Sequence, residues 1–116
     1  MKLIKNYING EKINISNNTG SVFDPSKGEQ IAEVVLSNHQ DFNLALESSR
    51  KSQTEWSKTT PLKRSRIISK YKELIESNLD EIAKLVSTEH GKTFDDAKGS
   101  VTRGLEVVEF ACGIPH

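Results

Sequence analysis

One arginine in the last third of the chain combines a charge suited to ligand binding with an unusual sequence neighbourhood. Arg103 is followed by Gly104 and preceded by Gly99, inside a segment whose apolar residues recur at helical spacing. Glycine in a helix interior costs about 1 kcal/mol relative to alanine, so two glycines beside one arginine call for a reason. Close approach of a ligand or of another backbone is one such reason.

Two interpretations of Arg103 fit this pattern. In the first, Arg103 is exposed and pairs with Glu106 or Glu109 at helical spacing, a contact worth about 0.2–0.5 kcal/mol. In the second, this side of the helix packs under another part of the protein and the guanidinium points into a cavity. There its planar fork binds a carboxylate through two parallel hydrogen bonds. The helical pattern alone leaves both interpretations open.

The other residue types that carry chemistry form no constellation in the sequence. Cys112 falls on the apolar side of the same helical pattern, where a small buried side chain is favoured over a nucleophile. The histidines, His39, His90 and His116, have no metal-ligand spacing. Neither of the two glycine-rich phosphate-binding patterns occurs. We therefore predict no catalytic, cofactor-binding or metal-binding residue in this chain.

Composition narrows the classes of partner and compartment. Lysine plus arginine equals aspartate plus glutamate at 16 each among 116 residues, so no net field favours nucleic acid or an anionic membrane. The single cysteine excludes an intrachain disulfide. The first residues lack the pattern of a secretory signal or a transit peptide, and no apolar run approaches the roughly 20 residues of a membrane span. We expect one small domain, or a piece of a larger one, in the cytoplasm.

The first third of the chain, about residues 5–36, has the pattern of short strands. Two alternating segments, about 5–8 and 12–15, flank Asn9-Gly10, the dipeptide that most readily forms a type I′ hairpin turn. A second turn is expected around Asp24-Pro25 and Gly28, followed by an extended run at 30–36. These strands have little to pair with locally.

The remainder, about residues 39–112, predicts four amphipathic helices. Their start signals are Asn38 with Asp41, Thr60-Pro61, Asn78 with Glu81, and Thr93 with Asp96, and Gly91 closes the third helix. Asp95 and Asp96 belong to the first turn of the last helix and not to an acid/base pair. The apolar stripe of the first helix comprises Phe42, Ala45, Leu46, Ser49, Gln53 and Trp56. The buried side of the last helix comprises Ala97, Val101, Leu105, Val108 and Cys112, and Arg103 lies opposite, with Gly99, Glu106, Val107 and Phe110.

Several of these segments together resemble the beginning of the NAD(P)-dependent aldehyde dehydrogenases. "NYINGE" resembles the opening strand of that family, and "VFDPSKGEQIAEV" resembles its next segment, with an aspartate in place of the usual asparagine before the proline. "GKTFDDAKGSVTRGLEVVEFACGIP" is similar to the matching segment of the CoA-acylating methylmalonate-semialdehyde (malonate-semialdehyde) dehydrogenases, with Ser100 where an acid is common. The resemblance covers essentially the whole chain.

The resemblance implies an enzyme with a three-layered α/β fold, of which residues 1–116 are the N-terminal part. The nucleotide-binding and catalytic domains, with the nucleophilic cysteine, lie outside this chain. The implied reaction converts a semialdehyde, CoA and NAD to propionyl-CoA or acetyl-CoA with release of CO2, in valine and myo-inositol breakdown. The implied assembly is a homotetramer. In that subfamily the arginine of this motif holds the carboxylate of the semialdehyde, a role that falls on Arg103.

This implied function has two rivals, and it carries expectations for the chain alone. The first rival is a segment of another aldehyde dehydrogenase, such as one acting on succinate semialdehyde. The second is a stand-alone helical binding module that holds a partner with its exposed apolar stripes. As part of an enzyme, the chain alone is expected to be inactive and poorly stable, because its apolar stripes then face water.

Overall fold

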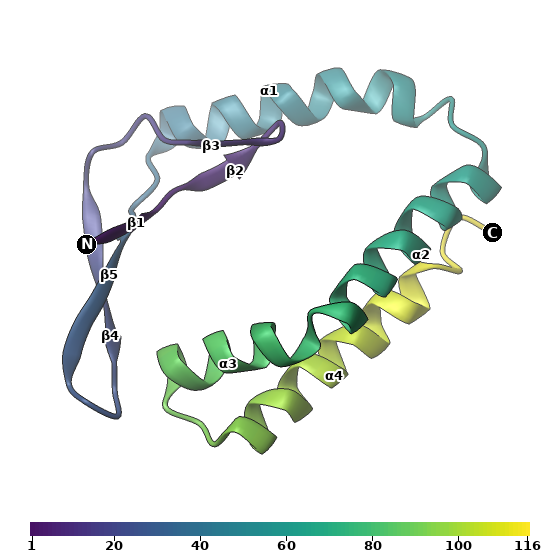
Figure 1. The fold of residues 1–116 in the computed structure, drawn as a ribbon. Coiled ribbons are helices and arrows are strands. Elements are labelled where there is room, and N and C mark those ends of the chain that lie inside the picture. The colour runs from purple at the N-terminus through teal and green to yellow at the C-terminus, as the bar shows by residue number, and fades with distance from the viewer. The chain divides into compact units, whose positions relative to one another are not determined.

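A computed structural model describes all 116 residues, Met1–His116. The chain forms two compact units, residues 1–58 and 59–116, which are described separately (Figure 1). The elements of the first unit are β1 (Lys2–Ile4), β2 (Asn6–Ile8), β3 (Glu11–Ile13), β4 (Thr19–Asp24), β5 (Glu29–Val35) and α1 (His39–Trp56). Those of the second unit are α2 (Pro61–Ser77), α3 (Leu79–His90) and α4 (Phe94–Ala111). The predicted order of short strands followed by four helices is confirmed.

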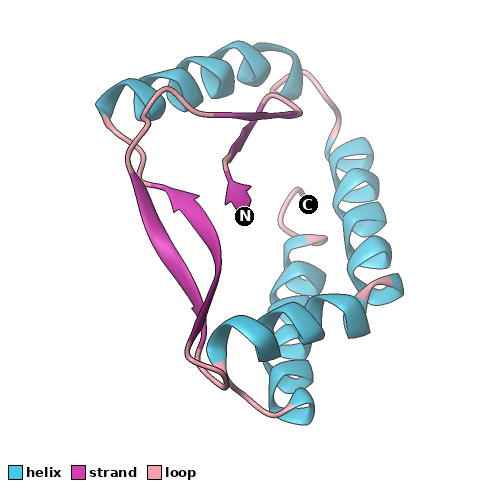
Figure 2. Ribbon diagram, turned by 60° about the vertical axis from the view of Figure 1, so that its left-hand side comes forward, coloured by secondary structure: helices cyan, strands magenta, loops and turns pink.

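The strands of the first unit form a three-stranded sheet and a separate hairpin, coloured magenta in Figure 2. β5 is the central strand of the sheet and pairs parallel with β1 and antiparallel with β4. Its Ala32 and Val35 are the buried apolar residues of this unit. We expected the strands to have little to pair with locally, and this was wrong for the sheet: β4 and β5 pair across the turn at Asp24-Pro25. The sequence pattern also did not predict β1, which pairs only with a strand about 30 residues away.

The hairpin of β2 and β3 turns where its sequence predicts. Asn9 and Gly10 have φ angles of 52° and 77°, and Ile8 pairs with Glu11. Positive φ at both central residues is the requirement of a type I′ turn, whose twist matches that of the flanking strands. The turn prediction is therefore confirmed, with each strand one residue shorter than expected.

The start of α1 joins the helix to the chain that follows the hairpin. Asn38 and Asp41 form the predicted capping box, each side chain accepting from the other's backbone N–H at 3.0 Å. The Asp41 carboxylate also accepts from the backbone N–H groups of Ile15 at 2.6 Å and Ser16 at 3.1 Å. These hydrogen bonds, with the bond from Asn38 the largest cause, hold the pKa of Asp41 below its ordinary value. The carboxylate of Asp41 thus both caps α1 and binds the loop at Ile15 and Ser16.

The predicted stripe of α1 is only in part the side that packs. Asp41 is buried and Leu44, Ala45 and Ser48 are half-buried, whereas Phe42 is 59% exposed. The buried carboxylate decides this orientation, because it must face the backbone donors of the loop. An apolar pattern read alone does not contain that requirement.

The helices of the second unit begin and end close to the predicted residues. Thr60 caps α2 with Pro61 in the first position, and Gly91 closes α3 with φ 79°. Asn78 precedes α3 as predicted, but the predicted capping box there is wrong. Its amide donates to the carbonyl of Leu74 at 2.7 Å and makes no bond to α3, because Asn78 also ends α2.

α4 packs against both α2 and α3. Ala83 of α3 and Ala97 of α4 are fully buried, and the rest of the predicted buried side of α4 is half-buried. Ser65 of α2 donates to the carbonyl of Cys112 at 2.7 Å, so a hydrogen bond joins α2 to the end of α4. No helix of the chain has both the length and the apolar character needed to cross a bilayer.

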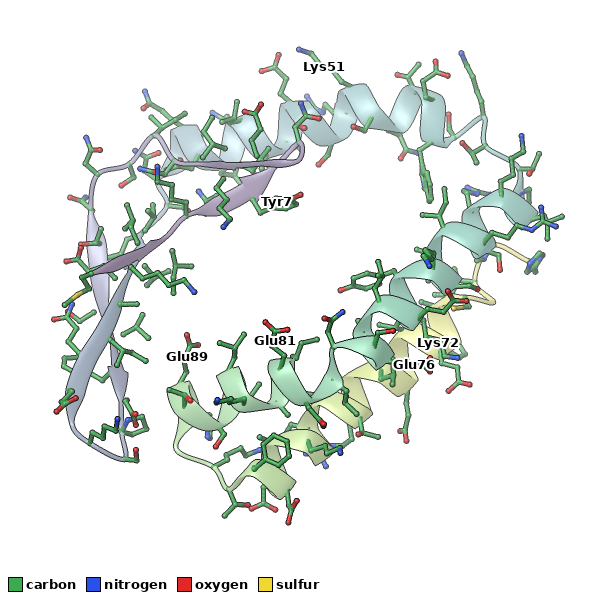
Figure 3. The ribbon with its side chains drawn as sticks, in the orientation of Figure 1. Tyr7, Lys51, Lys72, Glu76, Glu81 and Glu89 are labelled. Atoms are coloured by element: carbon green, nitrogen blue, oxygen red, sulfur yellow. The ribbon has the colours of Figure 1, made fainter.

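An ion pair on α2 faces the end of α4. Lys72 Nζ lies 3.4 Å from Glu76, and Figure 3 shows both side chains on this helix. The hydrogen bond and charge of Glu76 raise the pKa of Lys72, and the more distant charge of Glu109 adds to the effect. The pair is one turn of helix apart and stabilises the surface of α2 only modestly.

Candidate functional site

Arg103 lies on the side of α4 that no other helix of its unit covers. Its side chain is exposed, and Nη2 donates to the hydroxyl of Ser100 at 3.2 Å. The interpretation in which Arg103 pairs with Glu106 or Glu109 is correct about exposure and wrong about the partner, since no carboxylate lies within ion-pair distance of the guanidinium. Most of the five N–H donors of this side chain therefore stay open to another acceptor.

The Ser100 hydroxyl is fully engaged. It donates to the backbone carbonyl of Asp96 at 3.3 Å and accepts from Arg103. It also accepts from Nζ of Lys92 at 2.7 Å. One donor and two lone pairs are all that a serine hydroxyl offers, so its orientation is fixed. Two cationic groups thus meet at one neutral oxygen.

Local backbone chemistry brings Lys92 to this position. Gly91 adopts the left-handed conformation that ends α3, and the Ser87 hydroxyl donates to the carbonyl of Lys92 at 2.7 Å. The Lys92 side chain is half-buried and pairs with no acid. Lys98, by contrast, pairs with Asp80 at 3.1 Å. The sequence pattern did not single out Lys92, because only the tight turn between α3 and α4 brings this side chain to Ser100.

The two glycines beside Arg103 are not required by atoms of this unit. A Cβ added at Gly104 would meet nothing within 4 Å, and one at Gly99 would meet only Arg103 Nη1 at 3.8 Å, an ordinary contact. Val107 and Phe110 on the same side of α4 are 69% and 76% exposed. This side therefore combines a guanidinium without an acidic partner, Gly99 and uncovered apolar side chains, and the adjacent Gly104 is uncovered as well.

The other side chains that could carry chemistry do not gather at one site. Cys112 is half-buried with its thiol directed to the carbonyl of Val108 at 3.4 Å, as expected for a packed side chain. Asp95 and Asp96 lie in the first turn of α4. His39 stacks on Phe42, with ring centroids 6.2 Å apart. No three His, Cys, Asp or Glu side chains gather in a way that could hold a metal ion.

The first unit contains an open cleft between the hairpin and α1. Its lining residues are Ile8, Asn9, Glu11, Ile13, Leu44, Glu47, Ser48, Lys51 and Ser52. Its charged side chains include an ion pair of Lys51 with Glu47 at 3.8 Å, both strongly exposed (Figure 3 labels Lys51). This pair satisfies its own charges, and the cleft offers no group poised for chemistry.

Comparison with known proteins identifies the protein family that shares this sequence and fold. The model of the aldehyde dehydrogenase family matches residues 13–116. The chain is 44% identical over 115 residues to malonate-semialdehyde dehydrogenase 2 of Bacillus cereus (strain ZK / E33L). The matched region covers 98% of this chain and 24% of that relative.

Solved structures agree in fold. A protein of Sinorhizobium meliloti 1021, crystallised with NAD, matches with a TM-score of 0.95 and 40% identity over 100% of this chain and 24% of its own. The methylmalonate-semialdehyde dehydrogenase of Oceanimonas doudoroffii matches with a TM-score of 0.93 and 37% identity over 99% of this chain and 24% of its own. The chain thus spans about a quarter of the length of these relatives.

These matches confirm the predicted family and fold class. Along the whole length of this chain, the strands and helices reproduce one segment of the aldehyde dehydrogenase fold. The matched residues include Lys92 in the turn before α4, and α4 itself with Ser100 and Arg103. This chain belongs to the aldehyde dehydrogenase family.

Proposed function

We propose that this chain is the N-terminal part of an NAD-dependent, CoA-acylating dehydrogenase of malonate or methylmalonate semialdehyde, in which Arg103 binds the carboxylate of the substrate. The observation that carries the proposal is the state of Arg103. Its guanidinium is exposed, is held by a neutral hydroxyl instead of an acid, and lies on the uncovered side of α4 between two glycines. The similarity to malonate-semialdehyde dehydrogenase over 98% of the chain supports the choice of substrate.

Arginine suits this task because of its geometry. Its planar fork donates two parallel hydrogen bonds to one carboxylate, which fixes the orientation of the acid as well as its position. A semialdehyde bound in this way presents its aldehyde at a fixed distance from the arginine. The glycines leave space for a ligand or a neighbouring backbone beside the guanidinium.

The residues of this chain do not fit a dinucleotide or CoA site. No glycine-rich phosphate-binding loop occurs, and no group of basic side chains faces a cleft. We propose that NAD, which accepts the hydride of the oxidation, and CoA, which accepts the acyl group, bind to the rest of the enzyme. The same holds for the nucleophile, since Cys112 is packed within its own unit. The contribution of this chain is to bind and orient the substrate.

A chimera tests the proposal. The chain replaces the matching segment of the Bacillus cereus relative, and kcat/KM is measured for malonate semialdehyde and for propanal. We expect Arg103→Lys to lower kcat/KM for malonate semialdehyde about 10- to 100-fold, the cost of a charged bidentate hydrogen bond. The value for propanal should change less than about twofold, because propanal has no carboxylate.

Thr102→Val serves as the matched control, since Thr102 neighbours Arg103 and bonds only to the carbonyl of Lys98 within its own helix. An equal loss on both aldehydes would contradict the carboxylate role of Arg103. A chimera that oxidises succinate semialdehyde in preference to malonate semialdehyde would favour the succinate-semialdehyde type. A chimera without activity on any aldehyde would count against an enzyme segment and favour a helical binding module.

A further inference from the structure

We propose that Lys92 is a second cation of the same anion site, so that Lys92 and Arg103 together bind the anionic group of the substrate. This inference rests on the proposed function of Arg103 and names an additional residue that determines specificity. Lys92 Nζ and Arg103 Nη2 lie 2.7 and 3.2 Å from one oxygen, Ser100 Oγ. The ligand class is a short aldehyde that carries a carboxylate.

The charges of this cluster are not balanced within the chain. A hydroxyl is neutral, and neither cation has a carboxylate within ion-pair distance. Two like charges that share one acceptor repel each other, and a bound anion relieves this repulsion while it gains attraction from both. The cluster therefore favours an anionic ligand more strongly than a lone arginine does.

Neighbouring residues of the α3–α4 turn fix the position of Lys92. The left-handed Gly91 and the hydrogen bond from Ser87 fix its backbone, and the side chain is half-buried. Arg103 lies three residues after Ser100 on α4, at the spacing that places both on one side of the helix. Lys98 shows the ordinary alternative, because it is neutralised by Asp80.

A purely structural role for Lys92 predicts a different outcome. If the ammonium only ties the α3–α4 turn to α4, its loss lowers stability and affects every aldehyde alike. If it acts as a cation of the site, its loss raises KM for the carboxylated aldehyde alone, and the salt dependence of that KM weakens. The two roles are therefore separable by substrate and by ionic strength.

The experiment uses the same chimera with Lys92→Met, Ser100→Asp and the control Lys84→Met. Lys84 is exposed on α3 and forms no ion pair, so its loss removes the same charge without touching the cluster. We expect Lys92→Met to raise KM for malonate semialdehyde about three- to tenfold, with kcat within about twofold and with propanal unchanged. Ser100→Asp should act in the same direction, because its carboxylate neutralises part of the cluster.

Ionic strength provides a second readout. KM of the parent chimera for malonate semialdehyde should rise with added salt, and the slope should be smaller for Lys92→Met and Ser100→Asp than for Lys84→Met. Lys92→Arg keeps the charge and should retain most of the parent affinity. This variant separates loss of charge from faulty folding of Lys92→Met.

An unchanged KM and salt slope in Lys92→Met would overturn the inference, and so would an equal loss on malonate semialdehyde and propanal. A selective effect of Arg103→Lys without one of Lys92→Met would refute the second cation and leave the proposed function standing. If neither Arg103→Lys nor Lys92→Met changed the selectivity between malonate semialdehyde and propanal, both the proposed function and the second cation would be refuted.

Discussion

The two units of this chain bury different kinds of side chain. The first unit buries three polar residues beside two apolar ones: Ser16, Asp24, Asp41, Ala32 and Val35. The second unit buries only two alanines, Ala83 and Ala97, both with no exposed surface. One unit thus encloses two carboxylates and their hydrogen bonds, whereas the other encloses methyl groups between helices.

The difference teaches what each unit depends on. In the first unit a carboxylate collects backbone donors from a segment 25 to 26 residues away, so its order depends on the ionisation of that group. Asp24 adds a second depressed pKa, caused first by the hydrogen bond from the Ser26 hydroxyl at 2.6 Å. In the second unit, small side chains let helices approach closely, so its order depends on side-chain size. Three pairs of substitutions test this contrast.

The largest effect is expected from enlarging a buried alanine. Ala97→Leu should destabilise the second unit by about 1–3 kcal/mol, because three further carbons must enter a fully packed position of α4. Val107→Leu, on the exposed side of the same helix, should stay within about 0.5 kcal/mol. Urea denaturation followed by amide hydrogen exchange in α4 measures both. Similar losses at the two positions would contradict the assignment of the packed side.

A smaller effect at neutral pH, confined to the first unit, is expected from Asp41→Asn, since asparagine keeps only one of the two acceptor oxygens. The folded pKa of Asp41 lies below the ordinary value of 3.8. The stability that its carboxylate contributes is therefore fully present above about pH 4 and is lost as the pH falls through the lower folded pKa. Asp41→Asn should lower stability at pH 7 and reduce the acid-induced loss of stability below about pH 4. Part of that loss should remain, because the pKa of Asp24 is also lowered.

Fluorescence of Trp56, the single tryptophan, reports this unit in urea titrations at pH 7, 4 and 2.5. Asp95→Asn is the matched control, because Asp95 is exposed in the first turn of α4 and lies in the other unit. A pH dependence that Asp41→Asn leaves unaltered would show that the carboxylate is not the acid-sensitive group.

The smallest effect is a gain in stability on the uncovered side of α4. Gly104→Ala should stabilise the chain by up to about 1 kcal/mol, since the added Cβ meets nothing within 4 Å and the helix loses a flexible residue. Gly91→Ala should instead destabilise it by about 1 kcal/mol, because the φ of 79° suits glycine. Thermal unfolding of the 116-residue chain measures both, and a loss with Gly104→Ala would show that this side is already packed.

In the chimera, Gly104→Ala tests whether the space beside Arg103 is needed for activity. If the space beside Arg103 receives the substrate or a neighbouring backbone, the same substitution should lower activity although it stabilises the helix. Opposite signs in the two experiments would fit a glycine retained for close approach. Gains in both would leave the glycine without such a reason.

Much of the secondary structure was predictable because its signals are local. Asn9-Gly10 predicts the hairpin turn, Thr60-Pro61 the start of α2, and Thr93 the start of α4 within one residue. The stripe of α1, the cap at Asn78 and the pairing of β1 were predicted wrongly or missed. Each depends on a neighbour outside the local pattern: a loop, a preceding helix or a strand far along the chain.

The candidate site divides in the same way. The sequence by itself determined that Arg103 lies opposite the buried side of the last helix, between two glycines, because helical periodicity fixes which residues share a side. Only the tertiary structure decided that Arg103 has no acidic partner and that Lys92 meets it at Ser100. Side-chain partners depend on how the α3–α4 turn folds back, and the spacing of Lys92 and Ser100 along the chain does not reveal that geometry.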